Sequence, residues 1–253
     1  MTDPRTLFDL TGRVALVTGG TRGLGRALVQ AFASAGADVV VTSRKQDACN
    51  AVAAEVCADT GRRVVGQAAH VGRWEDLDRL VETVYEEFGR IDVLVNNAGM
   101  SPLYESSATL SEDLFDKVLA VNLKGPFRLA ALVATRMREG LGGSIVNIGS
   151  IAALYPTPRV IPYAAAKAGL NVITIALAQE FGPSVRVNAI LPGSFRTDVS
   201  RMWPPELIKQ LEASLVLGRV ADARELVGAA LYFASDASSY TTGSLLRVDG
   251  GSF

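Results

Sequence analysis

The side chains of Tyr163, Lys167 and Ser150 could together carry out acid/base chemistry. Lys167 follows Tyr163 by four residues and Ser150 precedes it by thirteen. The three alanines between Tyr163 and Lys167 favour a helix, in which residues i and i+4 share a face about 6 Å apart. A neighbouring cation lowers the pKa of a phenol from about 10, so that it can exchange protons near pH 7. We therefore predict proton transfer to a carbonyl oxygen that Ser150 polarises.

The Tyr-Lys pair alone fits a surface helix with a stray aromatic and a stray charge equally well, so the elements around it decide. Short β-branched runs alternate with helical stretches along the chain, which predicts βαβ units. We expect an α/β fold, a Rossmann-type doubly wound sheet of seven mostly parallel strands with helices on both faces. The predicted strands are Val14–Thr18, Val39–Thr42, Val64–Ala68, Ile91–Asn96, Ser144–Gly149, Val185–Leu191 and Ser244–Val248.

Length and composition predict one domain over residues 1–253. The chain is 49% hydrophobic, enough for a sizeable core, and it contains no repeat, linker or low-complexity tract. Residues 194–217 depart from the strand-helix alternation and contain Trp203 and two adjacent prolines. We expect this segment to cover the substrate.

Charge and hydropathy exclude several partners. The net charge of -1 offers no basic footprint for nucleic acid or an anionic membrane. No apolar run approaches the roughly 20 residues of a membrane span, and the first ten residues lack a signal core. A soluble, cytoplasmic protein is therefore expected.

The cysteines predict neither a disulfide nor a metal site. Cys49 and Cys57 fall in one predicted helix, which would separate their Cα atoms by about 12 Å, too far for a bridge. With one histidine and no Cys-x-x-Cys motif, no metal site is expected. Both thiols are interpreted as filling the core.

A glycine-rich turn follows the first predicted strand. Gly19, Gly23 and Gly25 are spaced Gly-x-x-x-Gly-x-Gly before a helical stretch. Such a turn lets the backbone approach a pyrophosphate, and the helix N-terminus supplies free N–H groups. A dinucleotide site is favoured over a turn that serves packing alone, and a P-loop is excluded because no Gly-Lys-Ser/Thr occurs.

The end of the second strand indicates which dinucleotide would bind. An NAD site usually places an acidic residue there, against the ribose hydroxyls. Here the chain reads Ser43-Arg44-Lys45, and Arg22 lies in the glycine turn. These cations suit a 2′-phosphate, so NADP(H) is predicted, with a solvated basic loop as the alternative. The missing acid also disfavours a methyltransferase.

From about Gly12 to Gly251 the chain resembles the classical short-chain dehydrogenase/reductase family. The matching motifs are Thr18 to Gly25, Asn96-Asn97-Ala98-Gly99, Asn122, Ser150, Tyr163 with Lys167, Pro192-Gly193 with Thr197, and Val248-Asp249-Gly250-Gly251.

The resemblance implies a role for each catalytic residue. Tyr163 would be the general acid/base and Ser150 would orient the substrate oxygen. Lys167 would lower the pKa of Tyr163 and hold the ribose, Asn122 would anchor a proton-relay water, and Thr197 would touch the nicotinamide carboxamide. The residues expected at the dinucleotide are Gly19, Thr21, Arg22, Gly23, Leu24, Gly25, Ser43, Arg44, Lys45, His70, Val71, Asn97, Ala98, Gly99, Tyr163, Lys167, Pro192, Gly193 and Thr197.

One position departs from the family pattern. Family members usually have Asp-Val after the third strand, where this chain has His70-Val71. The histidine either meets the adenine edge or is a loop residue without a role. A Ser-His-Asp hydrolase is disfavoured because Ser150 is not in a Gly-x-Ser-x-Gly motif.

The substrate pocket is expected to be fairly apolar, although the same side chains would also suit lid or interface packing. Its expected rim is Met100, Leu103, Ala152, Leu154, Tyr155, Ile161, Met202 and Trp203. Arg159, Arg196 and Arg201 would meet an anionic group or be solvated. Many relatives are 3-oxoacyl-[acyl-carrier-protein] reductases, but the helix after the Tyr-Lys pair lacks their basic residues. A free small-molecule carbonyl is therefore favoured.

Two further expectations concern assembly and class. The helical stretches 114–137 and 164–181 carry apolar residues on more than one face, which predicts a subunit interface, and relatives are commonly homotetramers. A non-catalytic NADP(H)-binding scaffold or sensor is the alternative to an enzyme. It would not need Asn122, Ser150, Tyr163 and Lys167 together, so an NADP(H)-dependent carbonyl/alcohol oxidoreductase is predicted.

Overall fold

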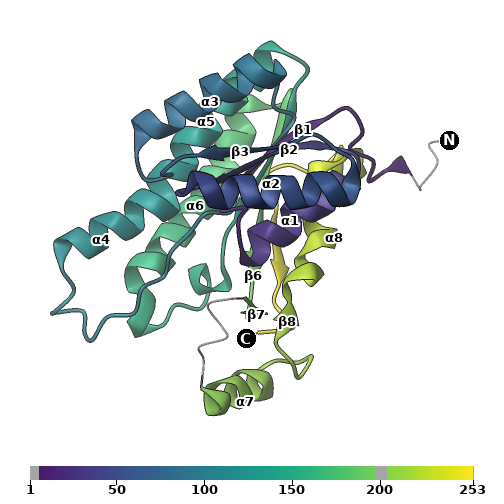
Figure 1. Cartoon of the computed structure of the whole chain (residues 1–253). Coiled ribbons are helices and arrows are strands. Elements are labelled where there is room, and N and C mark those ends of the chain that lie inside the picture. The colour runs from purple at the N-terminus through teal and green to yellow at the C-terminus, as the bar shows by residue number, and fades with distance from the viewer. Residues whose placement is uncertain (1–5, 198–203, 253) are drawn as a thin grey trace.

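The computed structural model describes residues 6–197 and 204–252. Within them, seven strands form one sheet in the order β3-β2-β1-β4-β5-β6-β9 (Figure 1). Every neighbouring pair is parallel, which confirms the predicted fold. The strands are β1 (Val14–Thr18), β2 (Asp38–Ser43), β3 (Val64–Ala68), β4 (Val93–Asn96), β5 (Gly143–Ile148), β6 (Val185–Pro192) and β9 (Leu245–Val248).

The order of the strands reverses between β1 and β4. The chain moves from β1 outward to β2 and β3, then returns to place β4 on the other side of β1. In such sheets ligands bind beyond the carboxyl ends of the strands at this switch point. The glycine turn after β1 and the Asn97-Ala98-Gly99 segment after β4 both lie there.

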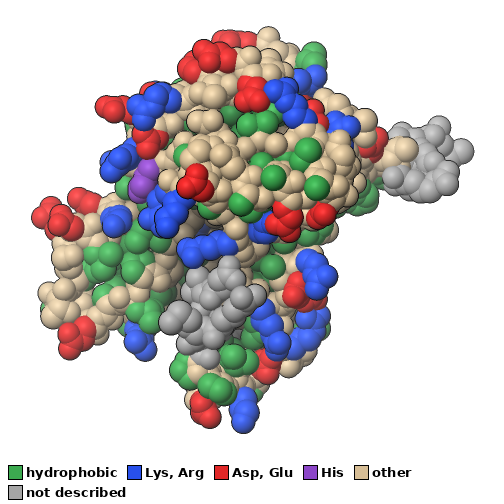
Figure 2. Space-filling model, viewed as in Figure 1, with side chains coloured by type: hydrophobic (Ala, Val, Ile, Leu, Met, Phe, Trp, Pro, Cys, Tyr) green, Lys and Arg blue, Asp and Glu red, His purple; other side chains and the backbone are tan. Residues whose placement is uncertain are grey.

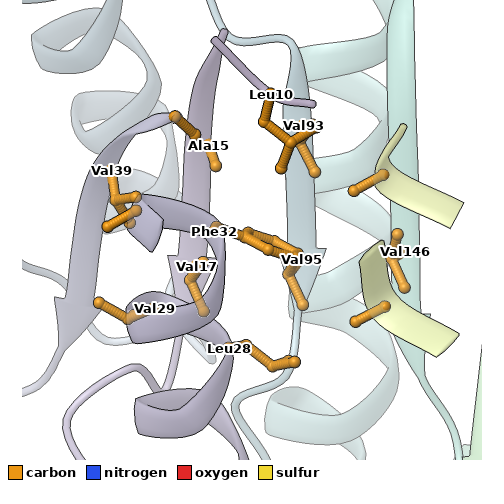
Figure 3. Close-up of a cluster of buried hydrophobic side chains, with 14 of the residues drawn as sticks. Leu10, Ala15, Val17, Leu28, Val29, Phe32, Val39, Val93, Val95 and Val146 are labelled. Atoms are coloured by element: carbon orange, nitrogen blue, oxygen red, sulfur yellow. The ribbon is translucent and has the colours of Figure 1, made fainter. Parts of the chain in front are cut away.

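Helices cover both faces of the sheet. One face carries α1 (Gly23–Ser34), α2 (Gln46–Thr60) and α8 (Val227–Ala234), and the other carries α3 (Trp74–Phe88), α5 (Gly125–Glu139) and α6 (Ile161–Phe181). Phe32 and Leu28 of α1 pack onto Val17, Val95 and Val146 of the central strands (Figure 3). Because the strands are buried on both faces, they read as continuous apolar runs.

The helical stretch predicted over residues 114–137 is confirmed, and it contains a π-helical turn. The run from Glu112 to Glu139 consists of α4 (Glu112–Leu119), the π-helical turn (Ala120–Lys124) and α5. In that turn the N–H of Gly125 donates to the carbonyl of Ala120, five residues earlier. A side chain on Gly125 would lie 2.0 Å from the Val71 carbonyl oxygen, so the crossing of the π-helical turn over the β3–α3 connection requires glycine.

Two helical stretches, Glu112–Glu139 and Pro158–Phe181, are long and apolar enough to cross a membrane by length and composition. In their most apolar windows, 50% and 44% of the residues are buried inside the protein. Core helices of soluble proteins pass the same test. Here α5 and α6 pack against the sheet, so the apolar residues on their inner faces belong to the core.

The two cysteines differ in environment. Cys49 is buried, with Sγ 3.4 Å from the Ser43 hydroxyl, as expected of a core thiol. Cys57 is exposed, so the prediction that it fills the core is wrong. It lies on the outer face of α2. The inner face of the same helix carries the buried Val52 and Val56.

The segment 194–217 leaves the sheet after β6. Its described part contains β7 (Phe195–Arg196), which pairs with β8 (Ala221–Asp222), and α7 (Pro205–Ser214). This small sheet was not predicted. Figure 1 shows α7 beyond the carboxyl end of β6, apart from the main body of the fold. Arg201, Met202 and Trp203 lie outside the described residues.

Candidate active site

The glycine turn after β1 is closed against the β4 end of the sheet. A Cβ on Gly25 would lie 2.2 Å from the Gly19 carbonyl oxygen, and a Cβ on Gly19 would lie 2.8 Å from Asn97 Nδ2. Gly19 and Gly23 have φ of 65° and 53°, in the left-handed region that favours glycine. Only glycine therefore allows this backbone to fold so tightly at the switch point.

Asn97 and Thr18 hold the turn in place. Asn97 Nδ2 donates to the carbonyls of Thr18 (2.8 Å) and Gly19 (3.2 Å). The Thr18 hydroxyl accepts from the N–H groups of Asn97 (3.0 Å) and Ala98 (3.1 Å). The side chain of Asn97, predicted as a cofactor contact, is thus committed to the backbone of the turn.

The start of α1 has the properties of an anion site. Its N-cap, Arg22, makes no side-chain capping hydrogen bond and no acidic residue occupies the first turn. Thr21, Arg22 and Gly23 line a hollow of about 640 Å³ beside α1, together with Arg26 and Arg224. Leu24, by contrast, is half-buried and packs against the core, so its side chain anchors the helix.

The end of β2 presents cations to solvent. Ser43 is half-buried, whereas Arg44 and Lys45 are exposed, and neither makes a capping bond to α2. Basic side chains gather near the middle of the face shown in Figure 2, close to the single histidine. The Thr42 hydroxyl is buried without a hydrogen-bond partner. The tight turn, the uncapped helix and these cations fit a dinucleotide.

Tyr163 lies in the first turn of α6, next to the Ser150 hydroxyl at the end of β5. Ser150 Oγ accepts from the N–H of Ala152 (3.1 Å). Burial raises the pKa of Tyr163, and the neighbouring Ser150 hydroxyl opposes that shift. The net direction is opposite to the lowering that the sequence predicted, because desolvation of the phenolate is the largest effect.

Lys167 lies on the same face of α6, one turn beyond Tyr163. Its ammonium is 5.7 Å from the centre of the Tyr163 ring and donates to the carbonyl of Ile148 (2.7 Å). The side chain is 3% exposed, and burial lowers its pKa to about 8. The prediction that the Tyr163 phenol and the Lys167 ammonium lie next to each other is therefore confirmed.

Asn122 lies in the π-helical turn and is fully buried. Its Nδ2 donates to the carbonyls of Met100 (2.8 Å) and Val118 (2.9 Å), and its Oδ1 accepts from the N–H of Met100 (3.2 Å). A Cβ on Gly99 would lie 2.9 Å from Asn122 Oδ1 and 3.8 Å from Lys167 Nζ. Gly99, Asn122 and Lys167 thus meet where β4 ends.

The remaining predicted contacts lie along the same edge of the sheet. Pro192 ends β6, and a Cβ on Gly193 would lie 2.7 Å from Asp249 Cα, so this backbone crossing is tight. Thr197 faces the glycine turn: a Cβ on Gly23 would lie 3.5 Å from Thr197 Cβ.

His70 and Val71 follow β3, at the outer end of this edge. Both are half-buried, and His70 Nδ1 accepts from the N–H of Gly72 (3.1 Å). This hydrogen bond within the loop fixes the orientation of the imidazole through Nδ1 and does not involve Nε2.

The predicted rim residues are spread over two loops. Leu103, Leu154, Tyr155 and Ile161 are exposed, with Leu103 at 63%, while Met100 and Ala152 are half-buried. A second hollow, of about 360 Å³, lies between the 104–115 segment and the start of α6. It is lined by Tyr104, Ser107, Leu110, Ser111, Glu112, Phe115, Ile161 and Pro162.

Three residues with clear structural roles were not singled out from the sequence. Thr18 fastens the two central loops, and Arg247 bonds Asp249 (2.6 Å) and stacks over the Tyr155 ring. Tyr104 bonds the backbone at the start of α6. Thr18 stood inside a quoted motif and Arg247 directly precedes another, Val248-Asp249-Gly250-Gly251, but no motif marks Tyr104.

Comparison with known proteins gives the family. A family model described as enoyl-(acyl carrier protein) reductase matches residues 19–252. Human dehydrogenase/reductase SDR family member 4 is 38% identical over 245 residues, covering 96% of this chain and 88% of that protein. A 3-oxoacyl-[acyl-carrier-protein] reductase of Aquifex aeolicus is 35% identical over 249 residues, covering 97% of this chain and 99% of that protein.

Solved structures agree. The NADPH-dependent 3-quinuclidinone reductase of Rhodotorula rubra matches with a TM-score of 0.94 and 31% identity, over 99% of this chain and 95% of that one. The chain belongs to the short-chain dehydrogenase/reductase family of oxidoreductases, which bind a nicotinamide cofactor.

Proposed function

We propose that the protein is an NADP(H)-dependent oxidoreductase that interconverts a carbonyl and a secondary alcohol, with Tyr163 as the general acid/base. The observation that carries this proposal is the meeting of Tyr163, Ser150, Lys167 and Asn122 beyond the ends of β4 and β5. The glycine turn lies at the adjacent switch point. A scaffold that only bound a dinucleotide would not need a Tyr-Ser pair beside a buried lysine.

The protein's own residues would manage the proton. Tyr163 donates its hydroxyl proton to the carbonyl oxygen during reduction and takes it back during oxidation. Ser150, whose hydroxyl lies next to Tyr163, orients that oxygen. The Lys167 ammonium, held by the Ile148 carbonyl, stabilises the tyrosinate that forms and would also hold the ribose. When bound, the dinucleotide supplies or accepts the hydride.

Asn122 would anchor the proton-relay water. Both of its Nδ2 hydrogens and its Oδ1 are hydrogen-bonded to backbone groups, which fixes the orientation of the amide. Thr197, beside Gly23, would contact the carboxamide.

Preference for NADP(H) is proposed from the basic residues. Arg44 and Lys45 are exposed at the end of β2, and Arg22 is exposed at the start of α1. No acid stands at the end of β2 to hold unmodified ribose hydroxyls. The similar Rhodotorula rubra structure is of an NADPH-dependent reductase, which supports the same assignment.

A free small-molecule carbonyl is proposed as the substrate, in a pocket that the segment 194–217 covers. Reduction of a 3-oxoacyl group on acyl carrier protein is the second candidate, because one relative is such a reductase. The outer face of α6, however, carries Val172 and Ile175 rather than basic residues for an acidic carrier. Turnover compared between a 3-oxoacyl thioester on the carrier and free ketones separates the two.

We further infer a single-domain, cytoplasmic protein that assembles as a homotetramer and takes neither nucleic acid nor membrane as a partner. The exposed apolar side chains on α5 and α6, such as Phe127 and Val172, support an interface there.

The substitution Tyr163→Phe tests the proposal. It removes only the hydroxyl, so carbonyl reduction should fall by roughly 10² to 10⁴-fold, as when a general acid is lost. NADPH binding, followed by fluorescence, should stay within about twofold. Unchanged turnover in this variant would refute the assignment of Tyr163.

A further inference from the structure

Tyr104 ties together the two loops that flank the catalytic tyrosine. It lies in the loop between β4 and α4, and its hydroxyl donates to the carbonyl of Pro158 (2.7 Å). The same hydroxyl accepts from the N–H of Ile161, the first residue of α6, at 3.0 Å. One phenol therefore satisfies a donor and an acceptor of backbone that is more than fifty residues away in the sequence.

The start of α6 needs this partner because its own sequence supplies no cap. The first N–H groups of a helix have no partner within it, and a Ser, Thr, Asp or Asn at the N-cap usually accepts from one. The N-cap here is Val160, which has no side-chain acceptor, and Pro162 has no N–H. The Ile161 N–H is thus capped from another loop, by the Tyr104 hydroxyl.

The capped residue stands two positions before Tyr163. The Pro158 carbonyl belongs to the 3-10 turn Pro158–Val160, which leads directly into α6. By holding both the last turn before the helix and its first N–H, Tyr104 restricts rotation and fraying of the turn that carries the catalytic phenol. Misplacement of a reacting group by about 1 Å can lower a rate by roughly 10²-fold.

We propose that Tyr104 is a positioning residue for the reaction, which caps α6 and so fixes the Tyr163 hydroxyl against Ser150 and the substrate oxygen. It acts through Tyr163 and does not exchange protons itself. The kinetic part of this inference rests on the proposed function, whereas the capping part rests on geometry alone.

The variant Tyr104→Phe separates these roles because it keeps the ring and removes both hydrogen bonds. Tyr232→Phe is the matched control: its hydroxyl is hydrogen-bonded to the Thr241 hydroxyl (2.8 Å), and it lies in α8, on the opposite face of the sheet from α6. For each variant the measurements are kcat and KM for a carbonyl with NADPH, NADPH affinity, melting temperature, and hydrogen exchange of peptides spanning residues 158–166 and 168–178.

In Tyr104→Phe, exchange in residues 158–166 should accelerate about tenfold while residues 168–178 keep their protection, since only the first turn loses its cap. The value of kcat should fall roughly tenfold, with NADPH affinity unchanged and the melting temperature within about 2 °C of the parent. Tyr232→Phe should change none of these.

Unchanged exchange in residues 158–166, or faster exchange with an unchanged kcat, would overturn the inference. Equal losses of carbonyl turnover, NADPH affinity and melting temperature would also overturn it, because they indicate a purely structural role. If the parent protein reduces no carbonyl, the proposed function fails, and the exchange result alone decides whether Tyr104 caps α6.

Discussion

Lys167 carries its charge at a cost to the stability of the fold. Burial lowers its pKa from the ordinary 10.5 of a lysine to about 8, so the unfolded chain binds this proton more tightly than the folded chain does. Below pH 8 the lysine is protonated in both the folded and the unfolded chain, so the folded protein bears the full free-energy cost of burying the charge. As pH rises from about 8 to 10.5, the folded lysine loses its proton first, and stability rises relative to a variant without this group.

We therefore expect Lys167→Met to abolish turnover and yet to stabilise the protein at pH 7. The gain in the free energy of unfolding should be about 1–2 kcal/mol. It is smaller than the cost of burying the lysine charge because the Ile148 carbonyl loses its hydrogen-bond donor. The advantage over the parent should shrink as pH rises towards 10.5. Urea unfolding of both proteins at pH 7, 8.5 and 10 measures this difference, and a difference independent of pH would contradict it.

Arg44 should decide between the two nicotinamide dinucleotides. A guanidinium bound to the 2′-phosphate contributes about 1.5–3 kcal/mol, so Arg44→Ala should weaken NADPH by roughly 10 to 100-fold. NADH lacks that phosphate and should change by less than about twofold. Titration of both dinucleotides by fluorescence provides the measurement. Equal losses for the two would show that Arg44 does not bind the phosphate.

At the scale of elements, the close approach of α1 to the β1 turn accounts for the glycine spacing. A methyl group on Gly25 would overlap the Gly19 carbonyl oxygen at 2.2 Å and Asn97 Nδ2 at 2.4 Å. Because the nearer atom belongs to the backbone, the strand end and the helix would have to separate. The uncapped N–H groups of α1 and the turn could then no longer meet one pyrophosphate.

Gly25→Ala should accordingly weaken NADPH by more than about tenfold and lower stability by about 1–3 kcal/mol. Gly228→Ala in α8 is the control, since a Cβ there meets nothing within 4 Å, and alanine should stabilise that helix by about 0.4–1 kcal/mol. Melting curves and NADPH titration compare the two variants. Equal changes in melting temperature and NADPH affinity in the two variants would contradict a special requirement for glycine where α1 crosses the β1 turn.

At the scale of the whole molecule, the exposed apolar residues on α6 point to assembly. Val172 is 68% exposed and Ile175 41% on a helix whose other face is in the core. Val172→Asp should lower the light-scattering mass from about four times the 26.7 kDa chain mass. Thr60→Asp, at the end of α2, should leave the mass unchanged. A parent protein that is already monomeric would remove the tetramer proposal.

The sequence predicted most of the fold because buried parallel strands have a recognisable pattern. Runs such as Val39-Val40-Val41 must be covered on both faces, and glycine turns after strands mark the ligand edge. Tyr163 and Lys167 could be proposed as a pair because they are one helical turn apart, whereas Asn122 was proposed from the family resemblance. The link from Tyr104 to Ile161 spans 57 residues and leaves no local pattern. The raised pKa of Tyr163 depends on burial, which a motif does not encode.

The π-helical turn at Ala120–Lys124 has an evolutionary consequence. A π-helical turn is in effect an α-helix that has gained one residue, and such turns tend to persist at functional sites. Deleting one residue from this turn would restore regular α-helical hydrogen bonding between α4 and α5, while rotating Asn122 out of register with Gly99. Selection for stability alone would favour that repair, so the surplus residue should survive only in lineages that still require the amide at this place.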